Sequence, residues 1–327
     1  MNAHLHVGDE TLAFGARKVI VTHPERIMFP SDRITKGDLV HYYRDVAHWI
    51  LPYLHDRPLT LQRWPRGIRG FSFFEKRAPR GMPDWIPTTS QPRADAKGTV
   101  TYPLACDASS LAWFANLGAI TLHVWLSRLH TISSPDFLLV DLDPVAGCTT
   151  ATLARVALAA RDELDAVGLK ARVKTTGGHG LHVLASITAR SNYERARAMN
   201  EALAHRLCHL LPRHTTIERT KSMRPRGRVY IDWAQEGLGK TVVPPYTVRA
   251  KPGAPVSMPI PWSEVEAMAV ERTPHSVEGA FARWNMESVR VFLAERGDPW
   301  AASFGHPHDL ERAMERARTR WGHGRSH

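Results

Sequence analysis

Two aspartates separated by one residue close an apolar run near the middle of the chain, D-F-L-L-V-D-L-D-P at residues 136–144. Because side chains alternate along a strand, Asp141 and Asp143 point to the same side and the intervening apolar residues point to the other. Two like charges this close need a proton or a cation between them, and hard carboxylate oxygens suit Mg²⁺ or Mn²⁺. The pair therefore predicts a divalent metal site, while the alternative that D-x-D only marks a strand end before Pro144 stays open.

The residues around this pair predict the element order βαββαβ, which is the split βαβ unit. The expected strands cover 137–142, 171–175, 181–186 and 229–233, and the expected helices cover 149–167 and 192–211. In the usual arrangement the first strand lies between the third and the fourth, and helices cover one face of the sheet. Asp232, in the alternating segment R-V-Y-I-D-W, then lies beside Asp141. A triad of carboxylates with room for two cations suits an in-line displacement at phosphorus.

A glycine-rich turn between the second and third strands, V-K-T-T-G-G-H-G-L-H-V at residues 173–183, offers donors for phosphate. The backbone amides of Gly177 and Gly178 can approach phosphate oxygens closely, because glycine has no side chain in the way. The side chains that add donors are Lys174, Thr176, His179 and His182. An ordinary hairpin turn is an equally good interpretation of these residues by themselves.

A basic stretch leads into the strand that carries Asp232 and continues past it. Because the stretch enters the predicted site, we expect Arg224 and Lys240 to contact a triphosphate or a template rather than to form a solvated face. Arg249, which follows the apolar run V-V-P-P-Y-T-V, can grip phosphate with two parallel hydrogen bonds. The alternative for Arg249 is a surface ion pair with a residue such as Glu264.

The whole chain of 327 residues has an ordinary globular composition, with 43% hydrophobic and 23% charged residues. Lys and Arg number 43 against 32 Asp and Glu, and the net charge of +11 favours a polyanionic partner such as nucleic acid. Three widely spaced cysteines indicate neither a disulfide framework nor a zinc knuckle, which fits a reducing compartment. The sequence shows no secretory signal and no run of about 18 apolar residues, so we expect no membrane segment.

Several motifs in register resemble the polymerase domain of bacterial ATP-dependent DNA ligase D, a member of the archaeo-eukaryotic primase-polymerase family used in non-homologous end joining. The motifs are D-L-D-P, T-T-G-G-H-G-L-H-V, Y-I-D-W and V-V-P-P-Y-T-V-R-A-K-P-G-A-P-V, with further matches from V-T-H-P-E-R-I-M-F-P onward. The resemblance covers residues 18–300. It implies that Asp141 and Asp143 bind both metals, and that Asp232 completes the catalytic metal site and helps to activate the primer 3′-hydroxyl.

The resemblance also implies contacts with nucleotide and DNA. The positions that match nucleotide contacts are His123, Thr176, His182 and Arg249, with Arg63 and Lys240 in similar basic positions. Phe73 and Phe74 match an aromatic pair that supports template bases, in line with base stacking as a sequence-tolerant way to hold unpaired strands. His23, Arg26 and Lys36 match the pocket for a recessed 5′-phosphate across a gap.

The sequence departs from the family pattern at two of these positions. His179 stands where the family commonly has Lys or another small or basic residue, which would make a triphosphate contact there weaker or pH-dependent. Arg26 replaces a frequent Lys, so the charge is kept and the geometry changes. No K-x-D-G ligase motif occurs, which indicates a stand-alone polymerase or an excised domain.

We therefore expect an α/β (α+β) primase-polymerase fold, with a split βαββαβ, RRM-like catalytic sheet packed beside an N-terminal α/β module. The expected divisions are an N-terminal module at 1–120 with the DNA-end and 5′-phosphate contacts, a catalytic module at 121–300 and a C-terminal tail at 301–327. The expected activity is template-directed nucleotide transfer with Mn²⁺ or Mg²⁺ at gaps or ends in DNA break repair, and the resemblance implies a preference for ribonucleotides.

The expected partners are DNA ends or gapped DNA with a 5′-phosphate, NTP or dNTP, and Ku and a DNA ligase, for a monomer in the cytoplasm near the nucleoid. Two alternatives stay open. D-L-D-P-V also satisfies the D-x-D-x-V signature of haloacid-dehalogenase-type phosphatases, with Asp141 as the nucleophile, although Y-I-D-W offers only one Asp of the further acidic pair required. The other alternative is a non-catalytic DNA-end-binding module, against which the intact carboxylate triad argues.

Overall fold

The chain folds into two compact units, each assembled from separate stretches of sequence. The structure is a computed structural model that describes residues 8–92, 97–271, 275–277, 279–302 and 306–322. Unit 1 comprises Met1–Trp125, Thr241–Ser257 and Ala282–Gly297, and unit 2 comprises Leu126–Lys240, Met258–Phe281 and Asp298–His327. The continuous segments predicted from the sequence differ from these units, and the functions assigned to those segments stay predictions.

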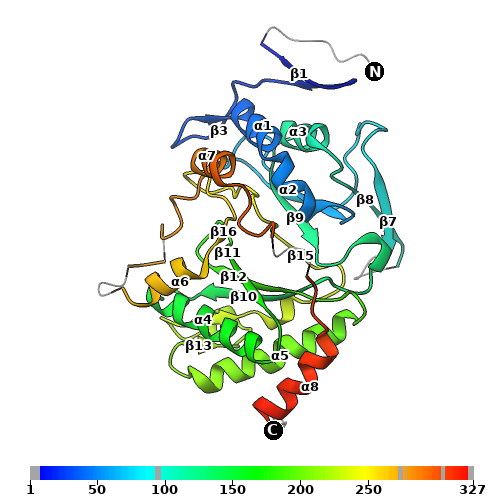
Figure 1. Cartoon of the computed structure of the whole chain (residues 1–327). Helices are drawn as coiled ribbons and strands as arrows, with labels where there is room; N and C mark the ends of the chain where they lie inside the picture. The colour runs from blue at the N-terminus through cyan, green and yellow to red at the C-terminus, as the bar shows by residue number, and fades with distance from the viewer. Residues whose placement is uncertain (1–7, 93–96, 272–274, 278, 303–305, 323–327) are drawn as a thin grey trace. The chain divides into compact units, whose positions relative to one another are not determined.

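A six-stranded sheet forms the centre of unit 2, in the order β13-β14-β10-β12-β11-β16 (Figure 1). Its strands are β10 (Phe137–Pro144), β11 (Ala171–Thr175), β12 (Leu181–Ser186), β13 (Thr215–Thr216), β14 (Val229–Ile231) and β16 (Pro259–Ile260). The strand β10 pairs antiparallel with β12 on one side and with β14 on the other. The predicted arrangement, with the first strand between the third and the fourth, is therefore confirmed.

Helices α4 (Thr150–Ala166) and α5 (Tyr193–Leu210) connect these strands and pack on one face of the sheet (Figure 1). Each helix begins at a side-chain cap, since Thr149 accepts a hydrogen bond from the third helical residue of α4 and Asn192 accepts the equivalent bond in α5. The fully buried apolar residues of these elements include Leu138, Leu142, Leu153, Val156 and Leu203. The apolar periodicity that predicts the elements also builds the core of the unit.

The remaining elements of unit 2 are η1 (Leu129–Thr131), η2 (Lys221–Met223), η3 (Trp233–Gln235), α6 (Trp262–Ala269) and α8 (Leu310–Trp321). Helix α8 lies in the segment expected to be a tail. It is held by Glu163 of α4, whose carboxylate accepts a hydrogen bond from Trp321 Nε1 at 2.5 Å and lies 3.4 Å from Arg320 Nε. Within the described ranges of the chain, no helix has the length and apolarity needed to cross a membrane.

A four-stranded sheet in the order β15-β9-β5-β6 forms the centre of unit 1. Its strands are β5 (Leu59–Arg63), β6 (Phe73–Glu75), β9 (Ala119–Trp125) and β15 (Thr241–Val242). Two-stranded sheets are formed by β1 (Glu10–Phe14) with β2 (Arg17–Val21), β3 (Ile27–Phe29) with β4 (Ile34–Thr35), and β7 (Thr88–Pro92) with β8 (Thr99–Pro103). The segment Thr241–Ser257, which contains β15, is attached to the rest of unit 1 by a hydrogen bond from the Tyr42 hydroxyl to the Tyr246 carbonyl at 2.8 Å.

The helices of unit 1 are α1 (Lys36–Asp45), α2 (Ala47–Leu54), α3 (Ala108–Asn116) and α7 (Met286–Arg296). The apolar stripe Leu39, Tyr42, Val46 and Trp49, with Thr35 and Asp38 as a candidate capping box, predicts one helix over residues 35–54, whereas the structure has two. Val46 separates them, because its φ of −87° and ψ of 2° leave the helical range and turn the backbone between α1 and α2.

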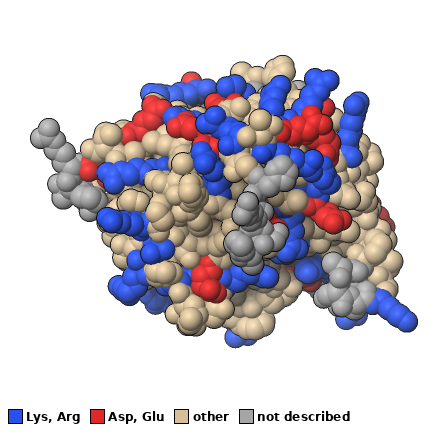
Figure 2. All heavy atoms as spheres, turned by 90° about the horizontal axis from the view of Figure 1, so that it is seen from below, with Lys and Arg blue, Asp and Glu red and all other residues tan. Residues whose placement is uncertain are grey.

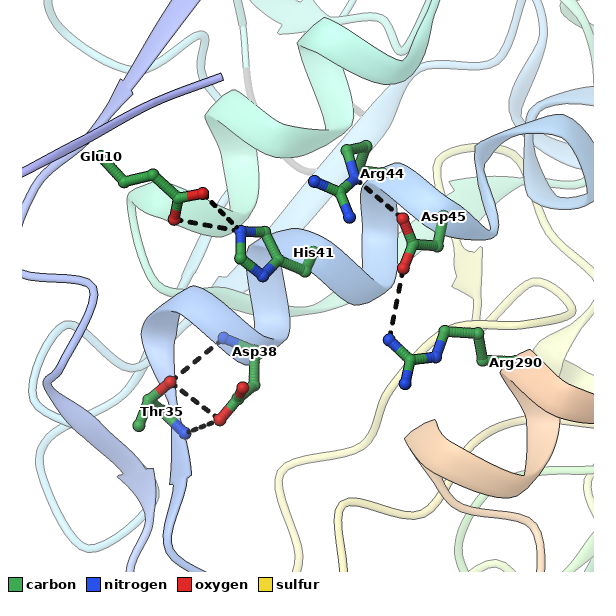
Figure 3. A network of polar contacts seen from close by, with 7 residues as sticks. All are labelled: Glu10, Thr35, Asp38, His41, Arg44, Asp45 and Arg290. Carbon is green, nitrogen blue, oxygen red and sulfur yellow. Dashed lines mark hydrogen bonds and ion pairs between the residues drawn. The ribbon is translucent and has the colours of Figure 1, made fainter. Parts of the chain in front are cut away.

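A network of polar contacts surrounds α1 (Figure 3). Thr35 and Asp38 form the capping box that the sequence predicts: Thr35 Oγ1 accepts from the Asp38 amide at 3.1 Å, and Asp38 Oδ2 accepts from the Thr35 amide at 2.8 Å. The other contacts in the network join His41 with Glu10, and Asp45 with Arg44 and Arg290. The start of α1, and with it Lys36, is thereby fixed in place.

Replacing the cap should weaken unit 1 measurably. We expect Thr35→Ala to lower the free energy of unfolding by about 1 kcal/mol, because the Asp38 amide loses its acceptor. Urea-induced unfolding followed by circular dichroism measures the change. Thr35→Ser, which keeps the hydroxyl, is the matched control and should stay close to wild type; equal losses in both variants would show that the cap contributes nothing.

Candidate active site

The strand register of unit 2 places three polar side chains in one row across the sheet. Asp141 of β10 lies opposite His182 of β12, and His182 lies opposite Lys174 of β11. Residues directly opposite each other in paired strands share a face, so the three side chains are neighbours. His182 Nε2 lies 3.3 Å from Asp141 Oδ1, and these side chains are 6% and 16% exposed. Lys174 is also buried, so the row sets a carboxylate, an imidazole and an ammonium group side by side.

Asp232 joins this row from the other side of β10. It follows directly on β14, which pairs with β10 from Leu142 to Pro144. The Asp232 amide donates to the Asp141 carbonyl at 2.9 Å. The backbones of Asp141 and Asp232 therefore lie next to each other, as the strand order predicts, while the roles of the two carboxylates stay predictions.

Asp143 lies further along β10, beside the glycine-rich turn. A Cβ atom on Gly180 would lie 3.4 Å from Asp143 Oδ1 and only 2.5 Å from the Leu142 carbonyl oxygen, so this position accepts no side chain. Thr176 closes the turn: its amide donates to the Gly180 carbonyl at 3.0 Å, and its hydroxyl accepts from the Gly178 amide at 3.2 Å. A phosphate contact by the Gly178 amide would therefore replace an existing hydrogen bond.

Arg224 contacts Tyr230, which in turn contacts the carboxylate of Asp232. The guanidinium carbon of Arg224 lies 3.3 Å from the centre of the Tyr230 ring, and the Tyr230 hydroxyl donates to Asp232 Oδ1 at 3.3 Å. Burial, together with the negative charge of Asp232, raises the pKa of Tyr230, so the phenol stays protonated and remains a donor. Tyr230 lies in the quoted motif R-V-Y-I-D-W, but only the paired strands show that its hydroxyl orients a carboxylate.

The donor set of Asp141, Asp143 and Asp232 consists of carboxylate oxygens, which are the ligands that Mg²⁺ and Mn²⁺ prefer. Asp143 Oδ1 is one of these oxygens, and the glycine at position 180 keeps a side chain away from it. Among the described residues, no three His, Cys, Asp or Glu side chains already lie close enough to hold a metal ion. The residue types therefore fit a divalent cation, and coordination would require the carboxylates to turn toward one another.

The predicted nucleotide and template residues of unit 1 gather on its four-stranded sheet. Phe74 of β6 packs edge-on against His123 of β9, with ring centres 5.4 Å apart. Arg63 of β5 lies 5.3 Å from the centre of the Phe73 ring and pairs with Glu75 at 2.7 Å. A nucleotide contact by Arg63 would therefore compete with an existing ion pair.

Phe71 is an aromatic residue of unit 1 to which the sequence analysis assigns no role. Its ring stacks on Phe73, with centres 5.8 Å apart and 20° between the planes, and Phe71 is 78% exposed. Phe74 is exposed as well, at 58%. Exposed aromatic rings next to cations suit stacking with unpaired bases. The sequence G-F-S-F-F contains a sign of this role, because Phe71 lies two residues before Phe73 and an alternating strand would place both rings on one face.

His23, Arg26 and Lys36 come together at the start of α1. The Lys36 amide donates to the Arg26 carbonyl at 2.8 Å, and the Arg26 amide donates to the His23 carbonyl at 3.1 Å. Lys36 is 3% exposed, and its Nζ donates to Thr22 Oγ1 at 3.1 Å. Burial and then the charge of Arg26 lower the pKa of Lys36 from 10.5 to about 8. A compact cationic pocket of this kind suits a phosphate group.

The remaining predicted residues are divided between the units. In unit 2, the Lys240 ammonium group contacts the Ala234 carbonyl, and His179 is exposed on the glycine-rich turn. In unit 1, the Arg249 amide donates to the Pro255 carbonyl at 2.8 Å. The structure thus collects the carboxylates and the glycine-rich turn in unit 2, and His123, Arg63, the aromatic residues and the cationic pocket in unit 1.

A split βαββαβ sheet with carboxylates at the ends of two neighbouring strands defines a primase-polymerase fold. The family model described as the LigD primase-polymerase domain matches residues 35–300, and the chain belongs to this family.

Two relatives agree with this assignment. The multifunctional non-homologous end joining DNA repair protein LigD of Mycobacterium tuberculosis is 33% identical over 266 residues, which are 78% of this chain and 34% of that protein. LigD of Pseudomonas aeruginosa is 30% identical over 302 residues, which are 91% of this chain and 34% of that protein. The chain thus spans about one third of the length of these relatives.

A solved structure supports the fold. The polymerase domain from Mycobacterium tuberculosis ligase D, in complex with DNA, matches with a TM-score of 0.77 and 30% identity. The match covers 87% of this chain and 97% of that one.

The glycine-rich turn leads to a prediction about stability. We expect Gly180→Ala to lower the free energy of unfolding by about 1–3 kcal/mol, because the new methyl group collides with the Leu142 carbonyl. Gly237→Ala is the control, since its Cβ would meet only the flexible Lys240 side chain, at 3.2 Å. Urea-induced unfolding compares the two, and an unchanged midpoint for Gly180→Ala would show that the turn has room for a side chain.

Proposed function

We propose that this protein is a template-directed nucleotidyltransferase of the ligase D type, which extends a primer at a gap or a DNA end and releases pyrophosphate. The observation that carries the proposal is the strand register that sets Asp141 beside Asp232 and Asp143 against Gly180. Membership of the LigD primase-polymerase domain family supports it. The DNA complex of the Mycobacterium tuberculosis polymerase domain agrees with nucleic acid as the partner.

In this proposal Asp141, Asp143 and Asp232 hold two divalent cations, Mn²⁺ or Mg²⁺, which supply positive charge to the attacking and leaving oxygens of an in-line transfer. The other residues of the site keep the carboxylates in position. His182 Nε2 lies 3.3 Å from Asp141 Oδ1, and the Tyr230 hydroxyl donates to Asp232 Oδ1. Each contact restrains one carboxylate, which would have to turn from its present orientation to coordinate a metal ion.

The glycine-rich turn of unit 2 is the proposed binding site for the triphosphate. Gly177 adopts a φ of +66°, a left-handed conformation that glycine adopts without strain, and His179 is exposed nearby on the turn. In this proposal the Thr176 hydroxyl and the His182 imidazole would donate to the bound phosphates. Ribonucleotides as the preferred substrate are part of the proposal, which on this point rests on the family resemblance.

Unit 1 offers the features for DNA binding. Exposed Phe71 and Phe74 would stack on unpaired template bases, and the pocket of His23, Arg26 and Lys36 would take the 5′-phosphate across a gap. Lys and Arg side chains spread over the face of the protein shown in Figure 2, between acidic ones. With the net charge of +11, we expect the affinity for DNA to fall steeply with salt.

The setting of the reaction is also part of the proposal. The relatives from Mycobacterium tuberculosis and Pseudomonas aeruginosa are named as non-homologous end joining proteins, which supports a role in the repair of broken DNA. Ku and a DNA ligase are then the proteins that would act at the same ends.

Primer extension on a gapped duplex with a downstream 5′-phosphate tests the activity. We expect the wild type to extend the primer with Mn²⁺, faster with ATP than with dATP. Asp141→Ala should reduce the rate by about a thousandfold or more, because a metal site that loses a carboxylate ligand no longer stabilises the transferred phosphoryl group.

Asp162→Ala is the control for this experiment, because Asp162 is an exposed carboxylate on α4 that pairs only with its neighbour Arg161 among the described ion pairs. It should extend the primer as the wild type does. Extension by Asp141→Ala at the wild-type rate would refute the polymerase assignment. Metal-dependent hydrolysis of a simple phosphomonoester without primer extension would instead favour the phosphatase alternative.

The low pKa of Lys36 predicts that the affinity for the 5′-phosphate depends on pH. Lys36 is mostly protonated below about pH 8 and loses its charge above that value. The gain in affinity that a 5′-phosphate confers on a gapped duplex should therefore be largest near pH 7, about tenfold or more, and should fall between pH 8 and 9. Fluorescence anisotropy with 5′-phosphate and 5′-hydroxyl duplexes measures this gain.

Lys36→Arg is the matched variant, because a guanidinium stays charged throughout this range. Its 5′-phosphate gain should be independent of pH from 7 to 9, and Lys36→Met should have little gain at any pH. A wild-type gain that does not change up to pH 9 would show that Lys36 is not the residue that senses the phosphate.

A further inference from the structure

On the edge that faces β14, the central strand β10 has no partner strand among the described residues just before Asp141. β14 pairs with β10 only from Leu142 to Pro144, and the chain then leaves the sheet as η3. On the same edge of β10, two residues before Asp141, the backbone of Leu139 is bonded by side chains. Leu139 N–H donates to Glu236 Oε2 at 3.0 Å, and Leu139 C=O accepts from Asn200 Nδ2 at 2.7 Å. Glu236 and Asn200 thus supply the hydrogen bonds that a longer β14 would have made.

The segment from Asp232 to Glu236 is therefore fixed to β10 at both of its ends. At its start the Asp232 amide donates to the Asp141 carbonyl at 2.9 Å, and at its end Glu236 accepts from Leu139. The two attachment points on β10 are separated by two residues. Because the predicted metal ligands Asp141 and Asp232 lie inside this closed loop, the loop limits how far apart their backbones can move.

Glu236 is an unusual residue for this place, because it is 0% exposed. Asn200 Nδ2 also donates to Glu236 Oε2 at 3.2 Å, whereas neither Glu236 Oε1 nor Asn200 Oδ1 has a hydrogen-bond partner among the described residues. A proton on the carboxyl group turns one of these two acceptors into a donor. The neutral form therefore satisfies the buried pair better than the carboxylate does.

One charged group, Asp136, acts on Glu236. Asp136 directly precedes β10, and its negative charge favours the neutral form of Glu236. Burial raises the pKa of Glu236 to about 8, and the charge of Asp136 adds to the increase. The side chain is therefore protonated at neutral pH.

We propose that Glu236, together with Asn200, is a positioning residue for the divalent-metal site: it clamps the Asp232–Glu236 segment to β10 and so sets the separation of Asp141 and Asp232. The inference deepens the proposed function and rests on it for the identity of the metal ligands. Groups that hold metal ligands in place typically matter 10- to 100-fold in metal affinity. Loss of the clamp should therefore weaken metal binding while the fold of unit 2 is retained.

Binding of Mn²⁺ alone tests the clamp without recourse to activity. Free Mn²⁺ is measured by electron paramagnetic resonance at pH 7, in the absence of DNA and nucleotide. We expect Glu236→Leu to raise the Kd for Mn²⁺ about 10- to 100-fold, because Leu139 N–H loses its acceptor. Glu236→Gln keeps an acceptor for Leu139 and adds a donor, so its Kd should stay within about twofold of wild type. Glu315→Ala, on the exposed surface of α8, is the control for loss of a carboxylate.

If Glu236→Leu folds and binds Mn²⁺ as tightly as the wild type does, the proposal that Glu236 is a positioning residue is overturned. If Glu236→Leu does not fold, Asn200→Ala takes its place, since it removes the hydrogen bond to the Leu139 carbonyl; unchanged affinity in that variant would overturn the proposal equally. Failure of the proposed function has a different signature, because the wild type itself would then neither bind Mn²⁺ nor extend a primer.

The protonation state has its own measurement. Folded Glu236 keeps its proton up to about pH 8, whereas the unfolded residue loses it near 4.5, so the wild type should lose stability as pH rises between these values. Glu236→Gln has no such proton. The difference in urea midpoint between wild type and Glu236→Gln should therefore move in favour of the Gln variant from pH 5 to pH 8. A difference that is constant over this range would show that Glu236 is ionised in the folded protein.

Discussion

The antiparallel pairing of β10 with β12 on one side and β14 on the other is the constraint on which the candidate site depends. Because the side-chain period of a strand is two residues, a slip of one residue would move Asp141 and Asp143 to the opposite face. The pairing of Asp141 with His182 and of Leu142 with Ile231 fixes that register from both sides. Chemistry at the end of β10 is therefore a consequence of its neighbours in the sheet.

Several buried or partly buried polar groups lie around β10. Lys174, His182 and Asp141 form a row on one face, and Glu236 and Asn200 bond the edge. Buried polar groups are costly unless they are hydrogen-bonded or paired, so each of them restricts where its neighbours can lie. The hydrogen bonds of Glu236 and Asn200 to Leu139 therefore restrain the backbone of β10 before any ligand binds.

The two units differ in the kind of ligand that they suit. Unit 2 presents carboxylates and a glycine-rich turn, which suit a divalent cation and a triphosphate. Unit 1 presents exposed phenylalanines and the cationic pocket around Lys36, which suit bases and a phosphate of DNA. The chemistry of a template-directed transfer needs both sets.

The sequence by itself determined the βαββαβ order, the common face of Asp141 and Asp143, and the capping box of Thr35 and Asp38, because each rests on local periodicity or on hydrogen bonds between close neighbours. Only the tertiary structure decided which distant groups meet. It showed that Glu75 forms an ion pair with Arg63 and that burial depresses the pKa of Lys36. It also showed that β14 ends early enough for the Glu236 side chain to accept the hydrogen bond of Leu139. These properties come from packing between residues far apart in the chain, about which a local pattern contains no information.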